Sequence, residues 1–229
     1  MGRILRLTSL CAGILGLGTM LLIGGCGRGG GGTRFRLMNA VPDESSLEVL
    51  VDSTSVSSNL AYGTSTGYVS EKSGSHQVGI EPSGSSTTLL QQSISFGSGT
   101  DTTVVSYGFS TRVANLVLTD DNSAPASGDF KIRVINVSPN LGPADVYIVT
   151  PGTALSTVSP TISNLGYGAT APYQSLSAAN YEIELTSVGQ KFAAVDTGTL
   201  TFSAGQVWTF VGLNNPQGGF TYTKLEDVN

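Results

Sequence analysis

Short hydrophobic runs, separated by glycine, proline, serine, asparagine and aspartate, recur along most of the chain. The clearest run, residues 181–185, alternates apolar and polar side chains with a period of two, which predicts a strand with one buried and one exposed face. The first half contains such runs at 34–39, 47–52, 67–71, 76–81, 87–96, 101–109 and 113–119. The second half contains them at 130–136, 144–149, 171–175, 181–187, 191–202, 206–213 and 219–225. About seven short strands in each half predict an all-β protein made of immunoglobulin-like β-sandwiches, with a small barrel as the alternative.

The second half of the chain repeats the first, which predicts an internal duplication. Both copies share an Arg-x-x-Asn-x-x-Pro opening, a hydrophobic run and a Tyr-Gly pair, in segments 35–42 and 132–139, 47–51 and 144–148, and 59–63 and 164–168. A second tyrosine follows the first by six residues in each copy, at Tyr68 after Tyr62 and at Tyr173 after Tyr167. The spacing between equivalent segments drifts along the chain, so we predict two tandem domains with similar strands and different loops.

The N-terminus has the layout of a secretory signal peptide, because Arg3 and Arg6 precede an apolar segment, small residues and then Cys26. The sequence Ile-Gly-Gly-Cys at 23–26 resembles the lipobox of bacterial lipoproteins, which implies cleavage before Cys26 and acylation of that cysteine. Two or more acyl chains anchor a protein stably, so the membrane is a predicted partner through Cys26. An uncleaved transmembrane helix and a plain signal peptide are the alternatives.

These features divide the chain into a signal peptide (1–25), a lipidated cysteine with a glycine-rich tether (26–33), a first sandwich repeat (34–119), a linker (120–129) and a second sandwich repeat (130–229). Gly27, and not an aspartate, follows the cysteine, which in enteric-type sorting implies the outer membrane. We therefore expect an exported protein that a lipid holds in the bacterial cell envelope, on either its periplasmic or its surface face.

The composition of the chain favours some classes of protein and argues against others. Only 12% of the residues are charged, 39% are hydrophobic, and the formal net charge is −5. This composition is typical of a secreted all-β protein, and an acidic surface argues against nucleic acid, whose binding needs clustered lysine and arginine. Cys11 and Cys26 both fall in the N-terminal segment, so no disulfide is predicted in the β-domains.

The shared segments also resemble a known family. The Arg-x-x-Asn-x-x-Pro opening, the hydrophobic strand after it, the Tyr-Gly with a later tyrosine, and the glycine-containing turn before residues 77–80 are similar to the domain of unknown function 4397. The resemblance covers both copies, at residues 34–119 and 131–228. It implies an exported bacterial β-domain, often lipid-anchored or part of the cell envelope. It implies no activity, because none is attached to the family.

One motif suggests catalysis. Residues 63–67 match the Gly-x-Ser-x-Gly nucleophile pattern around Ser65, and His76 is the only histidine that could act as its base. The motif requires a strand-to-helix turn, whereas the run that follows Ser65 is β-like, and the second copy lacks the serine. We predict that the protein is not an enzyme, and keep an esterase-like hydrolase as a remote alternative.

Acidic residues gather at the predicted linker and at the C-terminus: Asp120, Asp121, Asp129, Glu226 and Asp227. Calcium takes six to eight oxygen ligands, and such a cluster between two sandwiches could supply several. The spacing fits no known calcium loop, so we expect a solvated linker and predict no metal or other cofactor.

The four repeated tyrosines, Tyr62, Tyr68, Tyr167 and Tyr173, are the candidate ligand-binding residues. They suit an aromatic platform for a sugar, or equally corner residues whose hydroxyls bind the backbone. Their repetition at one spacing favours the structural role, because folds repeat more faithfully than sites.

The arginines of the first strand, Arg36 and Arg133, are expected to pair with a carboxylate or to cover apolar surface with their stems. The sequence as a whole predicts a non-catalytic binding or scaffolding protein of the cell envelope. Its expected partner is an envelope protein or a polysaccharide, and a glycan or cell-wall binding module is the alternative.

Overall fold

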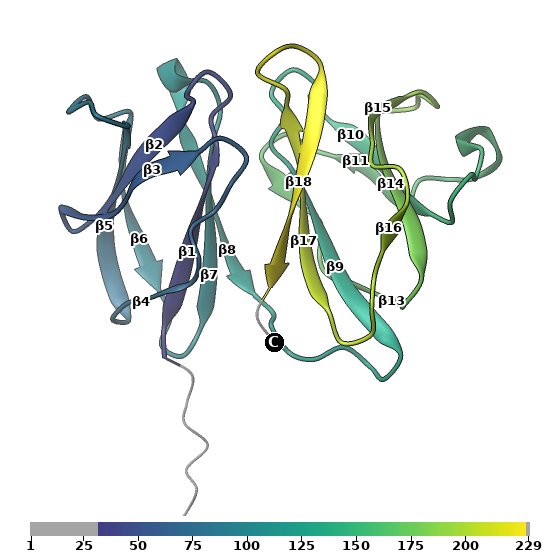
Figure 1. The fold of residues 1–229 in the computed structure, drawn as a ribbon, viewed down its shortest axis with the longest axis horizontal. Coiled ribbons are helices and arrows are strands. Elements are labelled where there is room, and N and C mark those ends of the chain that lie inside the picture. The colour runs from purple at the N-terminus through teal and green to yellow at the C-terminus, as the bar shows by residue number, and fades with distance from the viewer. Residues whose placement is uncertain (1–31, 228–229) are drawn as a thin grey trace, which may run out of the picture. The chain divides into compact units, whose positions relative to one another are not determined.

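The computed structural model describes residues 32–227. Eighteen strands and two short 3₁₀ turns, η1 (Ser110–Arg112) and η2 (Leu155–Thr157), make up the regular structure of these residues (Figure 1). The prediction of an all-β, sandwich-like protein is confirmed. Cys26 and the predicted signal peptide lie outside the described residues, so the lipid anchor stays a prediction. No helix in the range 32–227 is long and apolar enough to cross a membrane.

The first sandwich consists of two four-stranded sheets. One sheet has the order β4-β1-β7-β8, with β1 (Arg34–Ala40), β4 (Val69–Ser70), β7 (Asp101–Tyr107) and β8 (Ala114–Asp120). The other has the order β3-β2-β5-β6, with β2 (Ser46–Val51), β3 (Thr54–Ala61), β5 (Gly74–Pro82) and β6 (Leu90–Phe96). Strand β1 runs parallel to β7, while the other pairs are antiparallel. Apolar side chains of both sheets, among them Phe35, Leu47, Ile80 and Phe96, fill the space between them.

The second sandwich has the same strand order. One sheet has the order β12-β9-β17-β18 with β13 also on β9, from β9 (Asp129–Asn136), β12 (Ala169–Thr170), β13 (Gln174–Ser177), β17 (Val207–Asn214) and β18 (Phe220–Asp227). The other has the order β11-β10-β14-β15 with β16 also on β14, from β10 (Ala144–Val149), β11 (Ile162–Leu165), β14 (Asn180–Ser187), β15 (Ala193–Asp196) and β16 (Leu200–Thr201). Here β9 is parallel to β17, as β1 is to β7.

The central strands β1, β7, β9 and β17 are buried on both faces, and their buried positions include polar residues as well as apolar ones. In β1, Phe35 and Leu37 face the core of the first sandwich. The alternate residues Met38 and Ala40 face a second apolar cluster. That cluster, which we call the junction core, joins both sandwiches and contains Met38, Ala40, Val105, Leu118, Ile135, Val137, Val211, Leu213 and Leu225. The two sandwiches accordingly form one compact unit.

The structure differs from the sequence prediction mainly at sheet edges. Strands β3 and β11 were not predicted, because each lies at the edge of its sheet and buries little. In β3, with the sequence TSVSSNLA, only Leu60 is fully buried, so the strand has no period-two hydrophobic signal. The single run predicted at 191–202 is interrupted and forms β15 and β16. The chain between β8 and β9 spans 121–128, so both ends of the predicted linker belong to strands.

Candidate functional site

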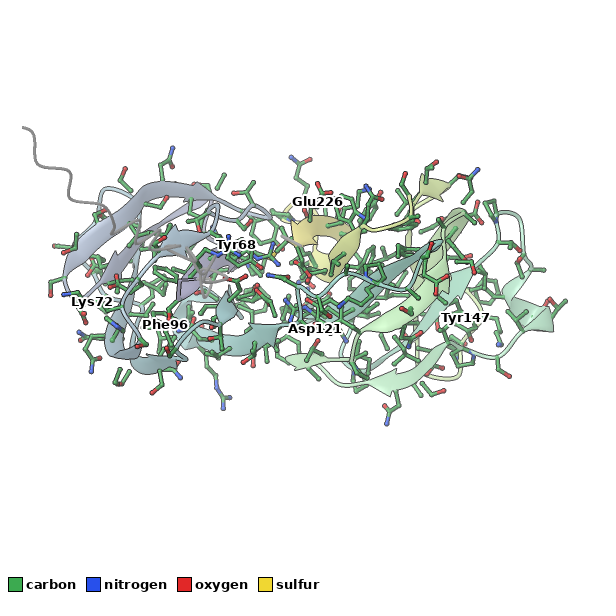
Figure 2. The ribbon with its side chains drawn as sticks, turned by 90° about the horizontal axis from the view of Figure 1, so that it is seen from below. Tyr68, Lys72, Phe96, Asp121, Tyr147 and Glu226 are labelled. Atoms are coloured by element: carbon green, nitrogen blue, oxygen red, sulfur yellow. The ribbon has the colours of Figure 1, made fainter. Side chains whose placement is uncertain are left out.

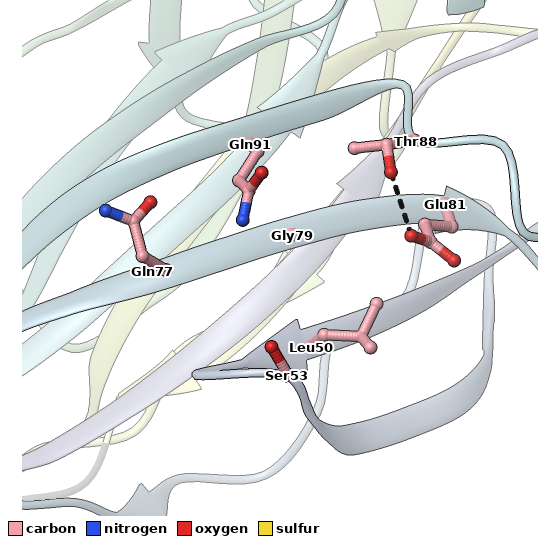
Figure 3. Close-up of a pocket in the computed structure, with 7 residues that line it drawn as sticks. All are labelled: Leu50, Ser53, Gln77, Gly79, Glu81, Thr88 and Gln91. Carbon is pink, nitrogen blue, oxygen red and sulfur yellow. Dashed lines mark hydrogen bonds between the residues drawn. The ribbon is translucent and has the colours of Figure 1, made fainter.

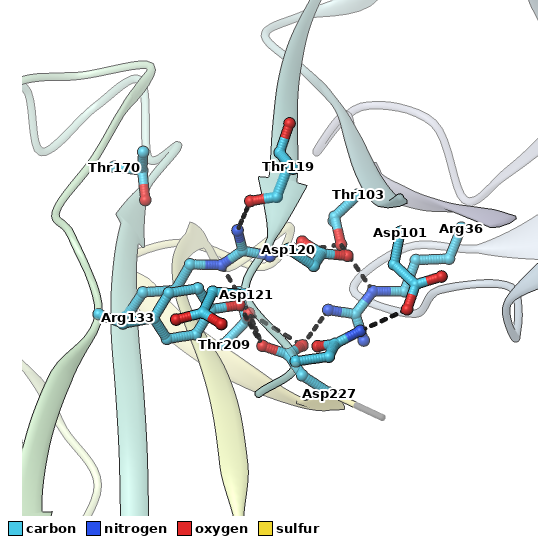
Figure 4. A network of polar contacts seen from close by, with 12 residues as sticks. Arg36, Asp101, Thr103, Thr119, Asp120, Asp121, Arg133, Thr170, Thr209 and Asp227 are labelled. Atoms are coloured by element: carbon cyan, nitrogen blue, oxygen red, sulfur yellow. Dashed lines mark hydrogen bonds and ion pairs between the residues drawn. The ribbon is translucent and has the colours of Figure 1, made fainter. Parts of the chain in front are cut away.

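Two buried ion pairs cross between the sandwiches in opposite directions (Figure 4). Arg36 of β1 pairs with Asp227 at the end of β18, and Arg133 of β9 pairs with Asp120 at the end of β8. Both arginine side chains are 3% exposed, and both carboxylates are fully buried. Buried charges are stable only when they are paired and their remaining donors and acceptors are satisfied. Each sandwich therefore supplies the carboxylate that the other sandwich's arginine requires.

Hydroxyl groups complete the coordination of Asp120. The Thr103 hydroxyl accepts a hydrogen bond from Arg36 Nε at 2.8 Å and donates one to Asp120 Oδ2 at 2.7 Å. The Tyr68 hydroxyl donates to the same carboxylate oxygen at 2.5 Å. Thr103 thus connects the two ion pairs, since its donor is the arginine of one pair and its acceptor is the carboxylate of the other.

The same arrangement recurs on the other side of the junction. The Thr209 hydroxyl accepts from Arg133 Nε at 2.8 Å and donates to Asp227 Oδ2 at 2.8 Å. The Tyr173 hydroxyl donates to Asp227 Oδ2 at 2.6 Å. The network is therefore an approximate twofold arrangement of arginine, threonine, aspartate and tyrosine from equivalent positions in the two sandwiches.

The tyrosine rings also contact the arginines. The guanidinium carbon of Arg36 lies 4.7 Å from the centre of the Tyr68 ring, and that of Arg133 lies 4.9 Å from the centre of the Tyr173 ring. Burial raises the pKa of both phenols above their usual value, against the opposing effect of the nearby guanidinium groups. Both hydroxyls consequently stay protonated and act as hydrogen-bond donors.

The remaining candidate tyrosines, Tyr62 and Tyr167, cross the junction as well. The Tyr62 hydroxyl donates to the backbone carbonyl of Asn214 in the second sandwich at 2.6 Å. The ring of Tyr167, which is 40% exposed, packs edge-on against Tyr107 of the first sandwich at 5.4 Å between centroids. All four predicted tyrosines therefore lie at the junction, and three of their four hydroxyls bond to protein acceptors.

The glycine of each Tyr-Gly pair has a backbone conformation that favours glycine, and Gly168 also lies close to Tyr107. Gly63 and Gly168 both adopt a positive φ, of 73° and 72°. A Cβ atom on Gly168 would lie 2.5 Å from the Tyr107 hydroxyl, whereas one on Gly63 would meet Leu213 at an ordinary 3.8 Å. The repeated motif is thus required by the backbone of the junction.

The expectation that the acidic residues form a solvated linker is wrong for two of them. Asp120 and Asp227 are buried, because Arg133 and Arg36 supply the charges that make burial tolerable. Asp121 does remain exposed, and hydrogen bonds from Ser123 and Lys131 lower the pKa of its carboxyl to about 2. Figure 2 shows Tyr68, Asp121 and Glu226 in the middle part of the molecule, where the two sandwiches meet. Within residues 32–227, no group of three or more histidine, cysteine, aspartate or glutamate residues is placed to hold a metal.

The residues of the suggested hydrolase motif serve the fold. Ser65 pairs as an isolated bridge with Met38 of β1, so it does not occupy a strand-to-helix turn. His76, on β5, bonds through Nδ1 to Asp52 Oδ2 at 2.7 Å and through Nε2 to the Lys72 carbonyl at 2.9 Å. Both ring nitrogens therefore have partners on the adjacent loop and hairpin, and none of these contacts involves Ser65.

Two hollows on the surface differ in size, and only one of them is large enough for a small ligand. A hollow of about 80 Å³ lies over the outer face of β5, above Gly79 and between Gln77 and Gln91 (Figure 3). It holds only a few water molecules, since each occupies about 30 Å³ in the liquid. A groove of about 410 Å³ lies beside the ion pairs and is lined by both sandwiches, including Tyr68 and Glu226. Its volume falls within the range of small-ligand sites, about 300–1,000 Å³.

The fold and the junction define an all-β protein whose two sandwiches share a buried, reciprocal polar interface. The chain belongs to the family described as Domain of unknown function (DUF4397), whose model matches residues 33–147, half of the chain. This match begins just before β1 and ends within β10, so it includes the first sandwich and the start of the second. No curated protein matches the sequence.

Three solved structures are similar to parts of the chain at low identity. The C-terminal domain of AlgF from P. aeruginosa matches with a TM-score of 0.29 and 10% identity, over 44% of this chain and 98% of that one. A family CBM26 module of Eubacterium rectale Amy13K, solved with maltoheptaose, matches with a TM-score of 0.30 and 8% identity, over 86% and 98%. A streptococcal virulence factor described as binding α-glucan matches with a TM-score of 0.27 and 12% identity, over 80% and 94%.

Proposed function

We propose that this protein is a lipid-anchored, non-catalytic component of the bacterial cell envelope that presents its two sandwiches as a single rigid binding or scaffolding unit. The observation that carries the proposal is the pair of reciprocal ion pairs, Arg36 with Asp227 and Arg133 with Asp120. Such pairs fix the orientation of the two sandwiches relative to each other. Two modules that moved independently would not need a fixed orientation.

The two buried carboxylates of the junction, those of Asp120 and Asp227, are each bonded to several side chains of the protein. Asp120 accepts from Arg133, Thr103 and Tyr68, and Asp227 accepts from Arg36, Thr209 and Tyr173. A carboxylate that acts as a general acid or base must be able to exchange a proton with a substrate, and these carboxylates are engaged and closed to solvent. This arrangement supports a role in holding the sandwiches together and not in a reaction.

The anchor rests on the N-terminal sequence, in which Arg3 and Arg6 precede an apolar segment and Cys26. Export through this signal places the sandwiches outside the cytoplasm, and the acyl chains would hold them at the membrane, by our proposal the outer one. The partner would then be an envelope protein or an envelope polysaccharide.

The test is metabolic labelling of the full chain with a clickable palmitate analogue, followed by separation of the inner and outer membranes. We expect label on the wild-type protein in the outer-membrane fraction and none on Cys26→Ala. A label that persists in Cys26→Ala, or a wild-type protein without label, would overturn the lipid anchor. Hydrolysis of p-nitrophenyl acetate that disappears in Ser65→Ala would overturn the non-catalytic role.

A further inference from the structure

A third hollow, of about 380 Å³, opens at the junction and is lined by both sandwiches. Tyr107, Arg112 and Ala114 line it from the first sandwich, and Tyr167 lines it from the second. Tyr107 and Ala114 lie directly opposite each other on β7 and β8. We call this hollow the aromatic cleft, and its volume falls within the range of small-ligand sites, about 300–1,000 Å³.

The aromatic cleft lies at one end of the first sandwich. Strand β1 runs parallel to β7, and their register places Arg34 beside Asp101 and Ala40 beside Tyr107. The chain enters β1 at Arg34 from the predicted tether, so the cleft is at the opposite end of this sheet. A lipid anchor before the tether would therefore leave the cleft accessible.

The equivalent tyrosine on the other side of the junction is already bonded. Tyr62 and Tyr167 are equivalent because the glycine that follows each donates its N–H to the asparagine of its sandwich's first strand, at 2.8 Å in both copies. The Tyr62 hydroxyl donates to the Asn214 carbonyl across the junction. The Tyr167 hydroxyl has no hydrogen bond within residues 32–227, so its donor is available.

The register of the central strands explains this difference. The threonines of the ion-pair network align β7 with β17, because each lies beside the arginine of its own sandwich. Tyr107 therefore corresponds to Leu213, and Gly108 corresponds to Asn214. Gly108 has a φ of 97° and ends β7, whereas β17 continues through Asn214. The cleft side thus gains a second phenol, and neither phenol has a hydrogen bond in the described part of the chain.

The loop after β7 holds the backbone of Arg112 beside these phenols. The Asp43 carboxylate accepts from the Ser110 N–H at 2.9 Å and from the Ser110 hydroxyl at 2.7 Å. The Arg112 N–H donates to the Phe109 carbonyl at 2.7 Å, and a Cβ atom on Gly108 would lie 2.6 Å from the Arg112 carbonyl oxygen. The loop is therefore tightly folded, while the Arg112 guanidinium takes no part in holding it.

This guanidinium differs from the others in the structure. Of the four arginines within residues 32–227, Arg34, Arg36 and Arg133 each pair with an aspartate. Arg112 is exposed and has neither an ion pair nor a side-chain hydrogen bond in this range. Burial and the neighbouring Tyr107 raise the pKa of the Tyr167 phenol, and the positive charge of Arg112 opposes this rise.

The chemistry of the cleft suits an anion. Its polar groups are one guanidinium and two phenol hydroxyls, all of which can donate. Among the described residues, no carboxylate lines the cleft, and Asp43 on the adjacent loop is occupied by Ser110. The Tyr167 ring is 40% exposed and packs edge-on against Tyr107, so one aromatic surface remains open beside the donors.

We propose that the aromatic cleft binds an acidic sugar residue, a uronate of a polysaccharide. The Arg112 guanidinium binds the carboxylate, whose two oxygens match its planar fork. The Tyr107 and Tyr167 hydroxyls donate to the oxygens of the sugar, and the exposed Tyr167 ring supports its apolar face. A neutral sugar would leave the charge of Arg112 without a partner. The proposal deepens the binding role given above and rests on it.

The test is calorimetric titration of the full chain, purified in detergent. The probes are hexagalacturonate, hexamannuronate and hexaguluronate, the methyl ester of each, and maltohexaose. We expect at least one of the three uronate hexasaccharides to bind at submillimolar concentration. Its methyl ester, which keeps the sugar ring and removes the charge, should bind at least tenfold more weakly, and maltohexaose should not bind.

Variants of the cleft connect the binding to its residues. Arg112→Gln should lose at least tenfold in affinity, and Tyr167→Phe should lose severalfold. Both should keep the melting temperature within a few degrees, because neither side chain has a hydrogen bond within residues 32–227. Lys72→Gln is the matched control, since it removes one positive charge from an exposed residue after β4, which pairs with the beginning of β1. Its affinity should equal that of the wild type.

Four results would each overturn the site. They are no binding of any uronate probe at millimolar concentration, equal affinity for the methyl ester or for maltohexaose, unchanged affinity in Arg112→Gln, and an equal loss in Lys72→Gln. Palmitate labelling of the same preparations separates this failure from failure of the lipid anchor, because none of these variants alters Cys26 or the segment before it.

Discussion

Arg36 and Asp227 form a buried ion pair although they lie 191 positions apart in the sequence. The pair joins the first strand of the first sandwich to the last strand of the second, and Arg133 with Asp120 repeats it in the opposite direction. A sandwich separated from its neighbour would expose the junction core and leave one arginine and one aspartate without their partners. We therefore infer that the two sandwiches fold and act together.

Removing one partner of an ion pair should be costly. Asp227→Ala leaves the buried Arg36 guanidinium without its carboxylate partner. Breaking a buried pair in this way typically lowers the free energy of unfolding by about 3–5 kcal/mol. Asp120→Ala should cost a similar amount because its environment is equivalent. The free energy of unfolding in urea measures both. The double replacement Arg36→Met with Asp227→Leu should recover only part of the loss, because the Thr209 and Tyr173 hydroxyls still lack their acceptor. A cost below about 1 kcal/mol for Asp227→Ala would contradict the account.

The hydroxyl of Tyr68 should contribute measurably to stability, unlike that of Tyr167. Tyr68→Phe removes a hydrogen bond to the buried carboxylate of Asp120, and bonds to charged groups contribute about 1.5–3 kcal/mol. Tyr167→Phe is the matched control, since this hydroxyl has no hydrogen bond within residues 32–227 and its ring is partly exposed; we expect a change within about 0.5 kcal/mol. Thermal unfolding of the two variants provides the comparison, and equal effects would be evidence against the assigned roles.

The two Tyr-Gly turns offer a test of the close approach at the junction. Gly63→Ala and Gly168→Ala place alanine at nearly the same positive φ, which costs each about 1 kcal/mol. In Gly168→Ala the new methyl also meets the Tyr107 hydroxyl, and such overpacking typically costs a further 1–3 kcal/mol or so. Urea denaturation should therefore show Gly168→Ala to be the less stable variant. Equal stabilities would mean that Tyr107 moves aside without cost.

His76 should titrate above the usual range of a histidine. Its hydrogen bond to Asp52 raises the pKa of the imidazole above the ordinary 6.5, and burial opposes this only in part. Because the folded pKa is the higher one, the stabilisation is complete below pH 6.5 and is lost as the pH rises through the folded pKa. NMR titration of this histidine measures the midpoint directly. Asp52→Asn should lower it, and a wild-type midpoint at or below 6.5 would rule out the pairing.

The hydrophobic pattern was sufficient to predict the sandwich class and most of the strands, because the central strands bury one or both faces. It was insufficient for β3 and β11, whose edge positions impose no alternation. The repeated Tyr-Gly and arginine positions could be recognised in the sequence as features that the fold needs. The reason why the fold needs these positions could not be recognised, because it lies in contacts between the sandwiches.

The acidic residues show what the sequence could not provide. A carboxylate in a segment rich in aspartate, asparagine and glycine is normally solvated, and Asp121 is. Asp120, its neighbour, is buried because β8 turns its side chain towards Arg133 of the other sandwich. The arginines were expected to pair with a carboxylate or to cover apolar surface, and only the three-dimensional structure identifies their partners, since the pairing crosses between the two sandwiches.

The central claim is that the junction makes the two sandwiches one cooperative unit, and the chain contains a natural probe for each. Trp208, the only tryptophan, lies in β17 of the second sandwich, and His76, the only histidine, lies in β5 of the first. We would follow tryptophan fluorescence and the histidine NMR signal in one urea series. The account predicts a single transition with the same midpoint and slope for both probes. Separate midpoints, with one sandwich unfolding while the other stays folded, would contradict it.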